Sequence, residues 1–108
     1  MKASDRYAVE GVSCRLDGRV LPVTNLSVSG LFVASDRPPL PGQAVSLELV
    51  FDAKPSFPIV GTVTWVNTPI EPKAPELPPG FGVKIASIPL PAKLAILDAL
   101  RRARPGKP

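Results

Sequence analysis

Proline is the residue that most constrains what this chain can fold into. The 108 residues include 15 prolines, and a residue without an amide hydrogen cannot donate to the ladder of a central strand. Most of the prolines gather in three segments, which we interpret as loops: residues 37–42, residues 54–58 and Thr68 to Gly80. We expect the third loop to be exposed and mobile. Ordered segments are expected between the loops.

These segments are short and rich in β-prone residues. Val12 to Leu16 and Arg19 to Thr24 flank Asp17-Gly18, a dipeptide that readily takes the positive φ angles of a tight hairpin turn. The other expected strands are Gly30 to Ala34, Ala44 to Phe51, Ile59 to Val66 and Phe81 to Ile85. Six antiparallel strands at this spacing predict a small β-barrel or sandwich.

The end of the chain has a different pattern. Residues 91–104 are rich in strong helix formers, and Pro105-Gly106 would stop a helix. One apolar side of this helix is made of Leu90, Leu94, Leu97 and Arg101, broadened by Ile96, Leu100 and Ala103. Such a side can cap one opening of a barrel or contact a partner protein, and we expect it to cap the barrel.

Residues that most enzymes use for catalysis are scarce. The chain has no His and a single Cys, Cys14, which excludes a His-dependent triad, a conventional Cys/His zinc site and an intrachain disulfide. We expect Cys14 to fill a position in a strand rather than to react. The composition therefore predicts a protein that is not an enzyme.

The net charge of +4 comes from one end of the chain. From Lys93 onward there are five basic residues and one acid, whereas residues 1–92 carry eight of each sign. A short basic tail after a helix is usually a solubilising end, so we expect neither DNA nor RNA as a partner. No apolar run approaches the roughly 20 residues that span a bilayer, and the start lacks a signal peptide's apolar stretch. We expect a cytoplasmic protein without membrane insertion.

The stretch from Asn25 to Gly30 joins the second and third expected strands. Its Asn25, Ser27 and Gly30 match the signature of the PilZ domain family, which is Asp or Asn, one residue, Ser, two residues and Gly. The segments Val63 to Val66 and Gly80 to Ile85 and the closing helix also resemble the family, in the family's order. This resemblance covers nearly the whole chain and implies a mainly β fold, a six-stranded antiparallel PilZ-type β-barrel with a C-terminal α-helix.

The family carries a second element, Arg, three residues and Arg, before its first strand. Two registers compete here: Arg6 to Glu10 puts a carboxylate at the second position, whereas Lys2 to Arg6 puts Arg6 there and Lys2 at the first. We prefer the register ending at Arg6, because Tyr7 after it resembles the family's entry into the first strand. The chain then divides into an arm (residues 1–8), a barrel domain with its closing helix (residues 9–104, helix about 91–104) and a tail (residues 105–108).

Binding members of the family take the bacterial second messenger cyclic di-GMP. The resemblance implies that Arg6 forms a bidentate contact with guanine or phosphate, and that Asn25 and Ser27 meet a guanine edge where Gly30 lets the backbone approach. Asn25 and Ser27 could instead only form the turn. Lys2 is a point charge and cannot replace a bidentate fork, which weakens the expected binding. Trp65 could stack on a base, although an aromatic residue in a central strand is more often packed.

Two functions follow from the resemblance, and neither needs a cofactor. The first is a non-enzymatic signalling module that binds cyclic di-GMP and relays it through protein contacts. The second is a PilZ adaptor that binds no nucleotide and acts through protein interactions in motility or type IV pilus function. Both imply an unidentified bacterial signalling or motility protein as partner, and we expect a monomer or weak dimer. A titration with cyclic di-GMP separates the two.

Overall fold

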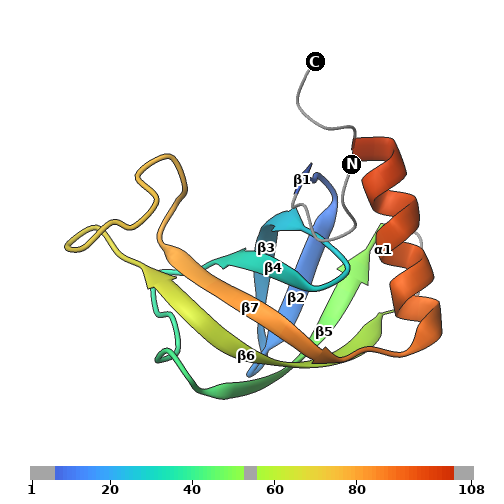
Figure 1. Cartoon of the computed structure of the whole chain (residues 1–108), viewed down its shortest axis with the longest axis horizontal. Helices are drawn as coiled ribbons and strands as arrows, with labels where there is room; N and C mark the ends of the chain where they lie inside the picture. Colours follow the sequence, from blue (N-terminus) through green and yellow to red (C-terminus); the bar gives the residue numbers. More distant parts are fainter. Residues whose placement is uncertain (1–6, 53–55, 104–108) are drawn as a thin grey trace.

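The computed structural model describes residues 7–52 and 56–103 (Figure 1). Six strands form a ring: β2 (Val12–Leu16), β3 (Arg19–Leu26), β4 (Gly30–Ala34), β5 (Ala44–Phe51), β6 (Phe57–Asn67) and β7 (Gly80–Ser87). They follow one another in the order β3-β2-β5-β6-β7-β4, and β4 pairs back onto β3. Every pairing is antiparallel. The predicted six-stranded antiparallel barrel is confirmed.

A seventh strand of two residues, β1 (Tyr7–Ala8), extends the sheet beside β3. Tyr7 pairs with Leu26 and Ala8 pairs with Asn25. The sequence placed these two residues in the arm, but the end of β3 offers them a partner. Because β2 pairs with β3 only as far as Pro22, the backbone of β3 beyond Pro22 has an open edge, which β1 occupies.

Two turn predictions can be compared with the backbone. Asp17 and Gly18 join β2 to β3 with φ angles of 52° and 79°, as expected for a hairpin turn. Pro58 lies within β6 opposite Glu48, although the sequence placed it in a loop. Pairing of β6 with β7 begins only at Val60, so Pro58 lies where β6 has one free edge and a missing amide hydrogen is tolerated.

The interior of the barrel is filled by side chains that alternate along the strands. The most completely buried of these are Cys14, Leu26, Leu31, Val33, Leu49, Ile59, Val63, Phe81 and Val83. Cys14 is a free cysteine, and burial raises the pKa of its thiol from 9.0 to about 12. Since the thiolate is the reactive form, Cys14 acts as a core side chain, in agreement with the sequence prediction.

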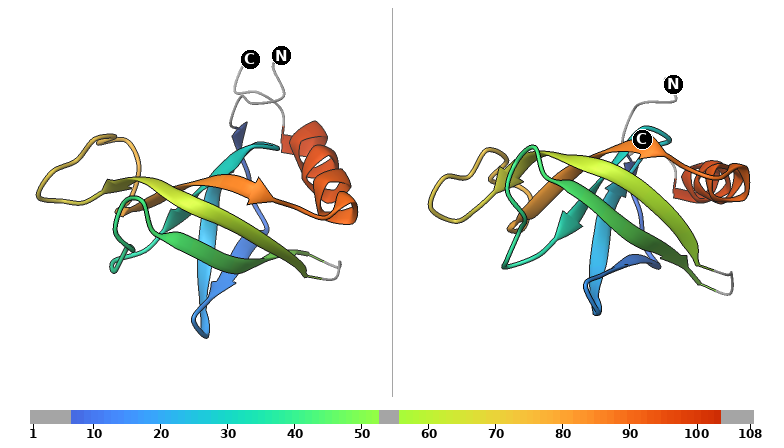
Figure 2. Two further views of the ribbon diagram at one scale, coloured as in Figure 1. Left: turned by 60° about the horizontal axis from the view of Figure 1, so that its bottom comes forward. Right: turned by 90° about the horizontal axis from the view of Figure 1, so that it is seen from below.

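The helix α1 (Leu90–Ala103) lies outside the ring, against β1 and β6 (Figures 1 and 2). Its position at the end of the chain matches the prediction. The predicted apolar side is buried only in part, at Ile96 and Leu100, whereas its leucine stripe is not. Leu90, Leu94 and Leu97 are 66%, 57% and 37% exposed. The side that packs on the barrel consists of Ala92, Ala95, Ile96, Ala99 and Leu100. Three alanines let the helix backbone approach closely, so two larger side chains suffice to join the core.

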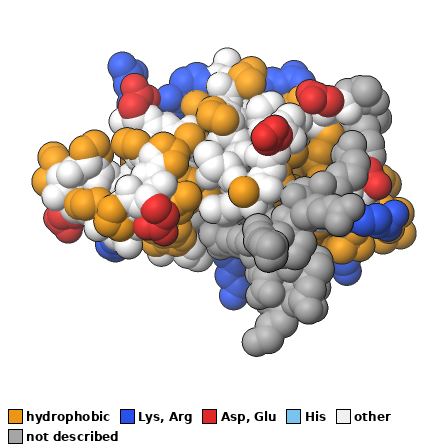
Figure 3. All heavy atoms as spheres, turned by 90° about the horizontal axis from the view of Figure 1, so that it is seen from above, with side chains coloured by type: hydrophobic (Ala, Val, Ile, Leu, Met, Phe, Trp, Pro, Cys, Tyr) orange, Lys and Arg blue, Asp and Glu red, His pale blue; other side chains and the backbone are white. Residues whose placement is uncertain are grey.

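The loop between β6 and β7 projects from the opposite end of the barrel and shows apolar and acidic side chains on its surface (Figures 2 and 3). Its base is organised by Asn67, which is 2% exposed. The Nδ2 group donates to the carbonyls of Ala74, Leu77 and Pro78 at 3.0 to 3.2 Å. The Oδ1 atom accepts from the amides of Lys73 and Ala74 at 2.9 and 3.0 Å. The loop is exposed as predicted, and one side chain holds its backbone.

No helix within the described residues has the length and hydropathy needed to cross a membrane.

Candidate nucleotide-binding surface

The register of the strands places Asn25 in a row that crosses five strands. Each residue of this row lies opposite the next: Ala8, Asn25, Phe32, Gly82 and Trp65. Opposed residues of antiparallel strands point to the same face of the sheet. Since Leu31 and Val33 belong to the core, Phe32 between them points outward. The row therefore lies on the outer face of the barrel, and it brings together Asn25 and Trp65, two of the predicted site residues.

Trp65 lies flat against this outer face. Its ring centroid is 5.1 Å from that of Phe32, with an angle of 35° between the planes. Gly82 lies under the indole, and a Cβ atom at that position would overlap the indole nitrogen. Phe32 is fully buried, whereas Trp65 keeps part of its surface exposed. Trp65 is thus packed, and only its exposed part is available to a ligand.

Ser27 is fully buried and its hydroxyl is used within the turn between β3 and β4. The Oγ atom accepts from the amides of Ser29 and Gly30 at 3.2 and 3.0 Å, and it donates to the Gly30 carbonyl at 3.2 Å. The Ser27 amide also donates to that carbonyl, at 2.8 Å. Ser27 therefore fixes the turn that follows Asn25 and presents no surface of its own.

Gly30 begins β4 and is buried. Among the described residues the glycines with positive φ are Gly11, Gly18 and Gly42, so Gly30 does not use a left-handed backbone. Its amide and carbonyl both bond to Ser27. The contribution of Gly30 seen in the structure is to close the turn.

Asn25 has an unused hydrogen-bonding atom. Its Oδ1 and the Oγ1 of Thr24 are buried and have no hydrogen-bond partner among the described residues, an uncommon state for a buried polar atom. The register shifts between Val23 and Asn25, so Thr24 is the extra residue of a β-bulge, a feature that redirects side chains. Two buried polar atoms without a partner among the described residues thus belong to consecutive residues at the edge where β1 joins β3.

The short strand β1 connects this edge to the predicted cationic element. Lys2 and Arg6 lie outside the described residues, but Arg6 is bonded to Tyr7, which pairs with Leu26. The amide of Val9, just after β1, donates to the carbonyl of Thr24 at 3.3 Å. In the sequence, Arg6 directly precedes a strand that is paired to the signature segment.

A model of the PilZ domain matches residues 5–102, which is nearly all of the chain and includes every element of the barrel. The chain belongs to the PilZ domain family. PilZ domains form a family of cyclic di-GMP binding domains that are generally non-catalytic receptors. A comparison with curated proteins finds no match to this sequence. The family predicted from Asn25, Ser27 and Gly30 is confirmed.

The PilZ barrel also places a cation beside the signature that the motif does not specify. Lys84 of β7 is exposed and lies opposite Gly30. It follows Gly82 by two residues, so both point to the outer face. Motif matching misses Lys84, Gly82 and Phe32. Strand alternation indicates them, because Phe81 and Val83 are core residues and their neighbours must point outward.

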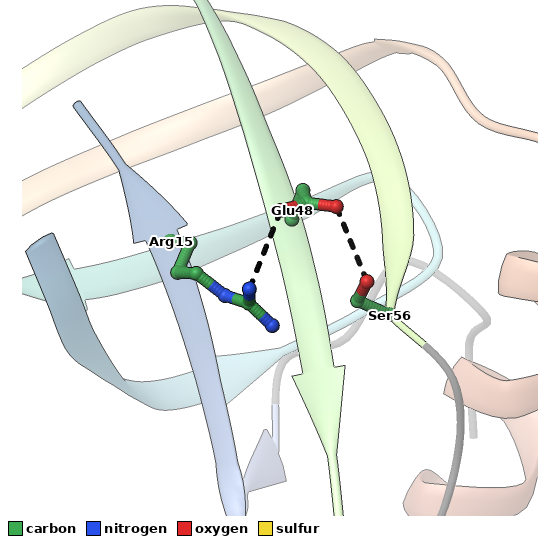
Figure 4. Close-up of polar contacts among 3 residues, drawn as sticks. All are labelled: Arg15, Glu48 and Ser56. Carbon is green, nitrogen blue, oxygen red and sulfur yellow. Dashed lines mark hydrogen bonds and ion pairs between the residues drawn. The ribbon is translucent and has the colours of Figure 1, made fainter. Parts of the chain in front are cut away.

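Another polar cluster of this PilZ domain lies on β2 and β5 (Figure 4). Arg15 Nη1 is 3.8 Å from Glu48 Oε1, and Ser56 Oγ donates to Glu48 Oε2 at 3.2 Å. Arg15 and Glu48 border an open groove of about 440 Å³. The cation here is already paired with a carboxylate, so the groove suits a dianion poorly. No cluster of potential metal ligands occurs among the described residues.

Proposed function

We propose that this PilZ domain binds cyclic di-GMP on its outer face and relays the binding through protein contacts. The pairing of Ala8 with Asn25 carries the proposal. It joins the chain segment that bears Arg6 to the signature residue whose Oδ1 has no partner among the described residues. Because cyclic di-GMP is a dianionic dinucleotide, its binding needs a cationic group on the arm and a preformed surface on the barrel.

Each polar group has a match in the ligand. The Asn25 side chain can turn outward and bring its buried Oδ1 to the imino or amino group of guanine, and the Arg6 guanidinium can contact guanine O6 and N7 or a phosphate. Lys84 can meet a phosphate as a point charge. The exposed part of the Trp65 ring can stack on a base. Ser27 and Gly30 serve binding by holding the turn.

A second function, a PilZ adaptor that binds no nucleotide, is favoured by two observations. The hydroxyl of Ser27 is used within its own turn, and Lys2 occupies the position where the family has an Arg. Such an adaptor would act through protein contacts in motility or type IV pilus function. The two functions make opposite predictions for a nucleotide titration.

Calorimetric titration of the full-length protein with cyclic di-GMP tests the receptor. We expect measurable binding that Arg6→Ala removes and that Glu10→Ala, the matched change in the competing register, leaves unchanged. Lys2→Arg should restore a guanidinium that can make a bidentate contact, and it should tighten cyclic di-GMP binding by up to about tenfold. The absence of heat and of chemical-shift changes at millimolar nucleotide would rule out the receptor and leave the adaptor as the function to test. Binding that survives Arg6→Ala would refute the chosen register.

The variants Asn25→Ala and Ser27→Ala distinguish a residue that contacts the nucleotide from one that only holds the turn. Asn25→Ala should weaken nucleotide binding with little change in the free energy of unfolding, because no bond of its Oδ1 is lost. Ser27→Ala should lower that free energy by about 1–3 kcal/mol, because the amides of Ser29 and Gly30 lose their acceptor. Urea unfolding of both variants, run beside the titrations, gives the comparison.

A further inference from the structure

The helix α1 directs three of its four leucines away from the barrel. Leu90, Leu94 and Leu97 are exposed, and the side that packs on the barrel is built mainly of alanine. A contiguous exposed apolar surface on a small domain commonly marks an interaction site. We call the exposed side, made of Leu90, Leu94 and Leu97, the leucine strip.

The spacing of the strip indicates the shape of its occupant. Leu90, Leu94, Leu97 and Arg101 follow one another at intervals of four, three and four residues, the spacing of a seam between two helices. Lys93 and Asp98 border the seam, one on each side. Helices that lie on a bilayer have a wider apolar arc. A narrow strip between charged residues fits another helix better than a lipid surface.

The charge around the strip indicates the occupant's chemistry. Lys93 and Arg101 are exposed, and the chain from Lys93 onward carries five basic residues and one acid. The strip is about 11 Å long at 1.5 Å per residue, so two strips bury much less than the roughly 1,200 Å² of a stable interface. In a contact this small, the like charges of a second copy would oppose binding, whereas an acidic partner would gain from Lys93 and Arg101 beside the strip.

We propose that the leucine strip binds an amphipathic helix of another protein whose apolar residues are flanked by Asp and Glu. This contact is the kind of relay that the proposed function requires. It stands independently of nucleotide binding, because the strip is already exposed in the protein without ligand. The contact should be weak, sensitive to salt and specific for the sign of the partner's charge.

Two synthetic helical peptides test the proposal. Both carry Leu at the a and d positions of three heptads; one has Glu at the e and g positions and the other has Lys. We expect the full-length protein, titrated without nucleotide into labelled peptide, to bind the Glu peptide at least tenfold more tightly by fluorescence anisotropy, and raised salt to reduce the difference. The combined change Lys93→Glu and Arg101→Glu should reverse the preference.

Substitutions in the strip supply the second arm of the test. Leu94→Ser combined with Leu97→Ser should weaken binding of the Glu peptide at least tenfold while leaving the thermal unfolding midpoint nearly unchanged. Ile70→Ser is the matched control, because Ile70 is 91% exposed and lies on the loop at the other end of the barrel. This control should bind the peptide as the wild type does.

Four results would overturn the proposal. The first is equal affinity for the two peptides, and the second is an equal loss of peptide binding in Ile70→Ser. The third is binding to phosphatidylserine vesicles that requires Leu94 and Leu97. The fourth is a dimer in sedimentation experiments that the Leu94→Ser and Leu97→Ser changes dissociate. The third would assign the strip to a membrane and the fourth to a second copy. Loss of nucleotide binding in any variant would bear on the proposed function alone.

Discussion

Asn67 holds a whole loop through its single buried side-chain amide. Its side chain makes five hydrogen bonds to the backbone of residues 73–78. Asn67→Ala should lower the free energy of unfolding by about 2 kcal/mol or more, since several buried backbone groups lose their partner. Urea unfolding measures the loss, and amide exchange should become faster across residues 68–79.

Asn67→Asp is the matched comparison for this prediction. A carboxylate can still accept from the amides of Lys73 and Ala74. It also places a buried negative charge against the three carbonyl oxygens, so the loss should be at least as large as in Asn67→Ala. Exchange across the loop that stays at the wild-type rate in Asn67→Ala would show that other contacts hold it.

Cys14 predicts a loss of stability at high pH. Burial raises the pKa of its thiol from 9.0 to about 12. Below pH 9 the thiol is protonated in both states. Between about pH 9 and 12 only the unfolded chain releases the proton, so stability falls as the pH rises, by up to about 1.4 kcal/mol per pH unit. The difference in this slope between wild type and Cys14→Ala, measured by urea unfolding, isolates the thiol. Equal slopes would contradict the prediction.

At the scale of single elements, the strands were predictable because their signals are local. Proline-rich loops separated most of them, although Pro22 and Pro58 lie within β3 and β6. Asp17-Gly18 defined the hairpin, and β2, β4 and β5 begin and end at the predicted residues. The orientation of α1 was not predictable, because both of its sides are apolar. Hydrophobicity favours burying all the leucines, whereas the side that meets the barrel combines three alanines with Ile96 and Leu100. Which side meets β1 and β6 depends on the assembled barrel.

In the candidate site too, the local signals were predictable from the sequence and the contacts between strands were not. The motif identified Asn25, Ser27 and Gly30, but it could not show that the Ser27 hydroxyl is used in its own turn or that the Oδ1 of Asn25 is unpaired. Those facts depend on the pairing of β1 and β4 with β3. The outward positions of Phe32 and Lys84 could have been read from strand alternation alone.

Pairing between β6 and β7 gives a prediction for Gly82. Gly82→Ala should displace the indole of Trp65, because a Cβ atom would overlap the ring, and should cost about 1–3 kcal/mol of stability. Trp65 is the single tryptophan, so its fluorescence should shift to longer wavelength. Ser87→Ala, an exposed position on the same strand, is the control and should leave the spectrum unchanged. An unaltered spectrum in Gly82→Ala would contradict this packing.

At the scale of the whole molecule, β1 lies between the two proposed binding surfaces. It pairs with the signature strand at Asn25 and also contacts α1. A nucleotide that holds the arm should therefore stabilise α1 and tighten binding of the acidic peptide. Coupling of this kind is reciprocal and is typically fivefold or more, or about 1 kcal/mol.

Titrating the peptide with and without saturating cyclic di-GMP measures this coupling. Removing residues 1–6 should abolish the nucleotide's effect and leave the affinity for the peptide intact. Identical peptide affinities with and without bound nucleotide would show that the two surfaces act independently.

Because the strands form a closed ring, labelling of the protein's own thiol can report when the barrel opens. The one thiol of the chain is sealed inside that ring, so a thiol-specific dye can react only with molecules whose barrel has come apart. The rate of dye incorporation in native buffer then counts opening events directly. A cysteine introduced at an exposed site such as Ile70 would in turn be the one position that takes up label in the folded protein, ready for distance measurements between the loop and a bound partner.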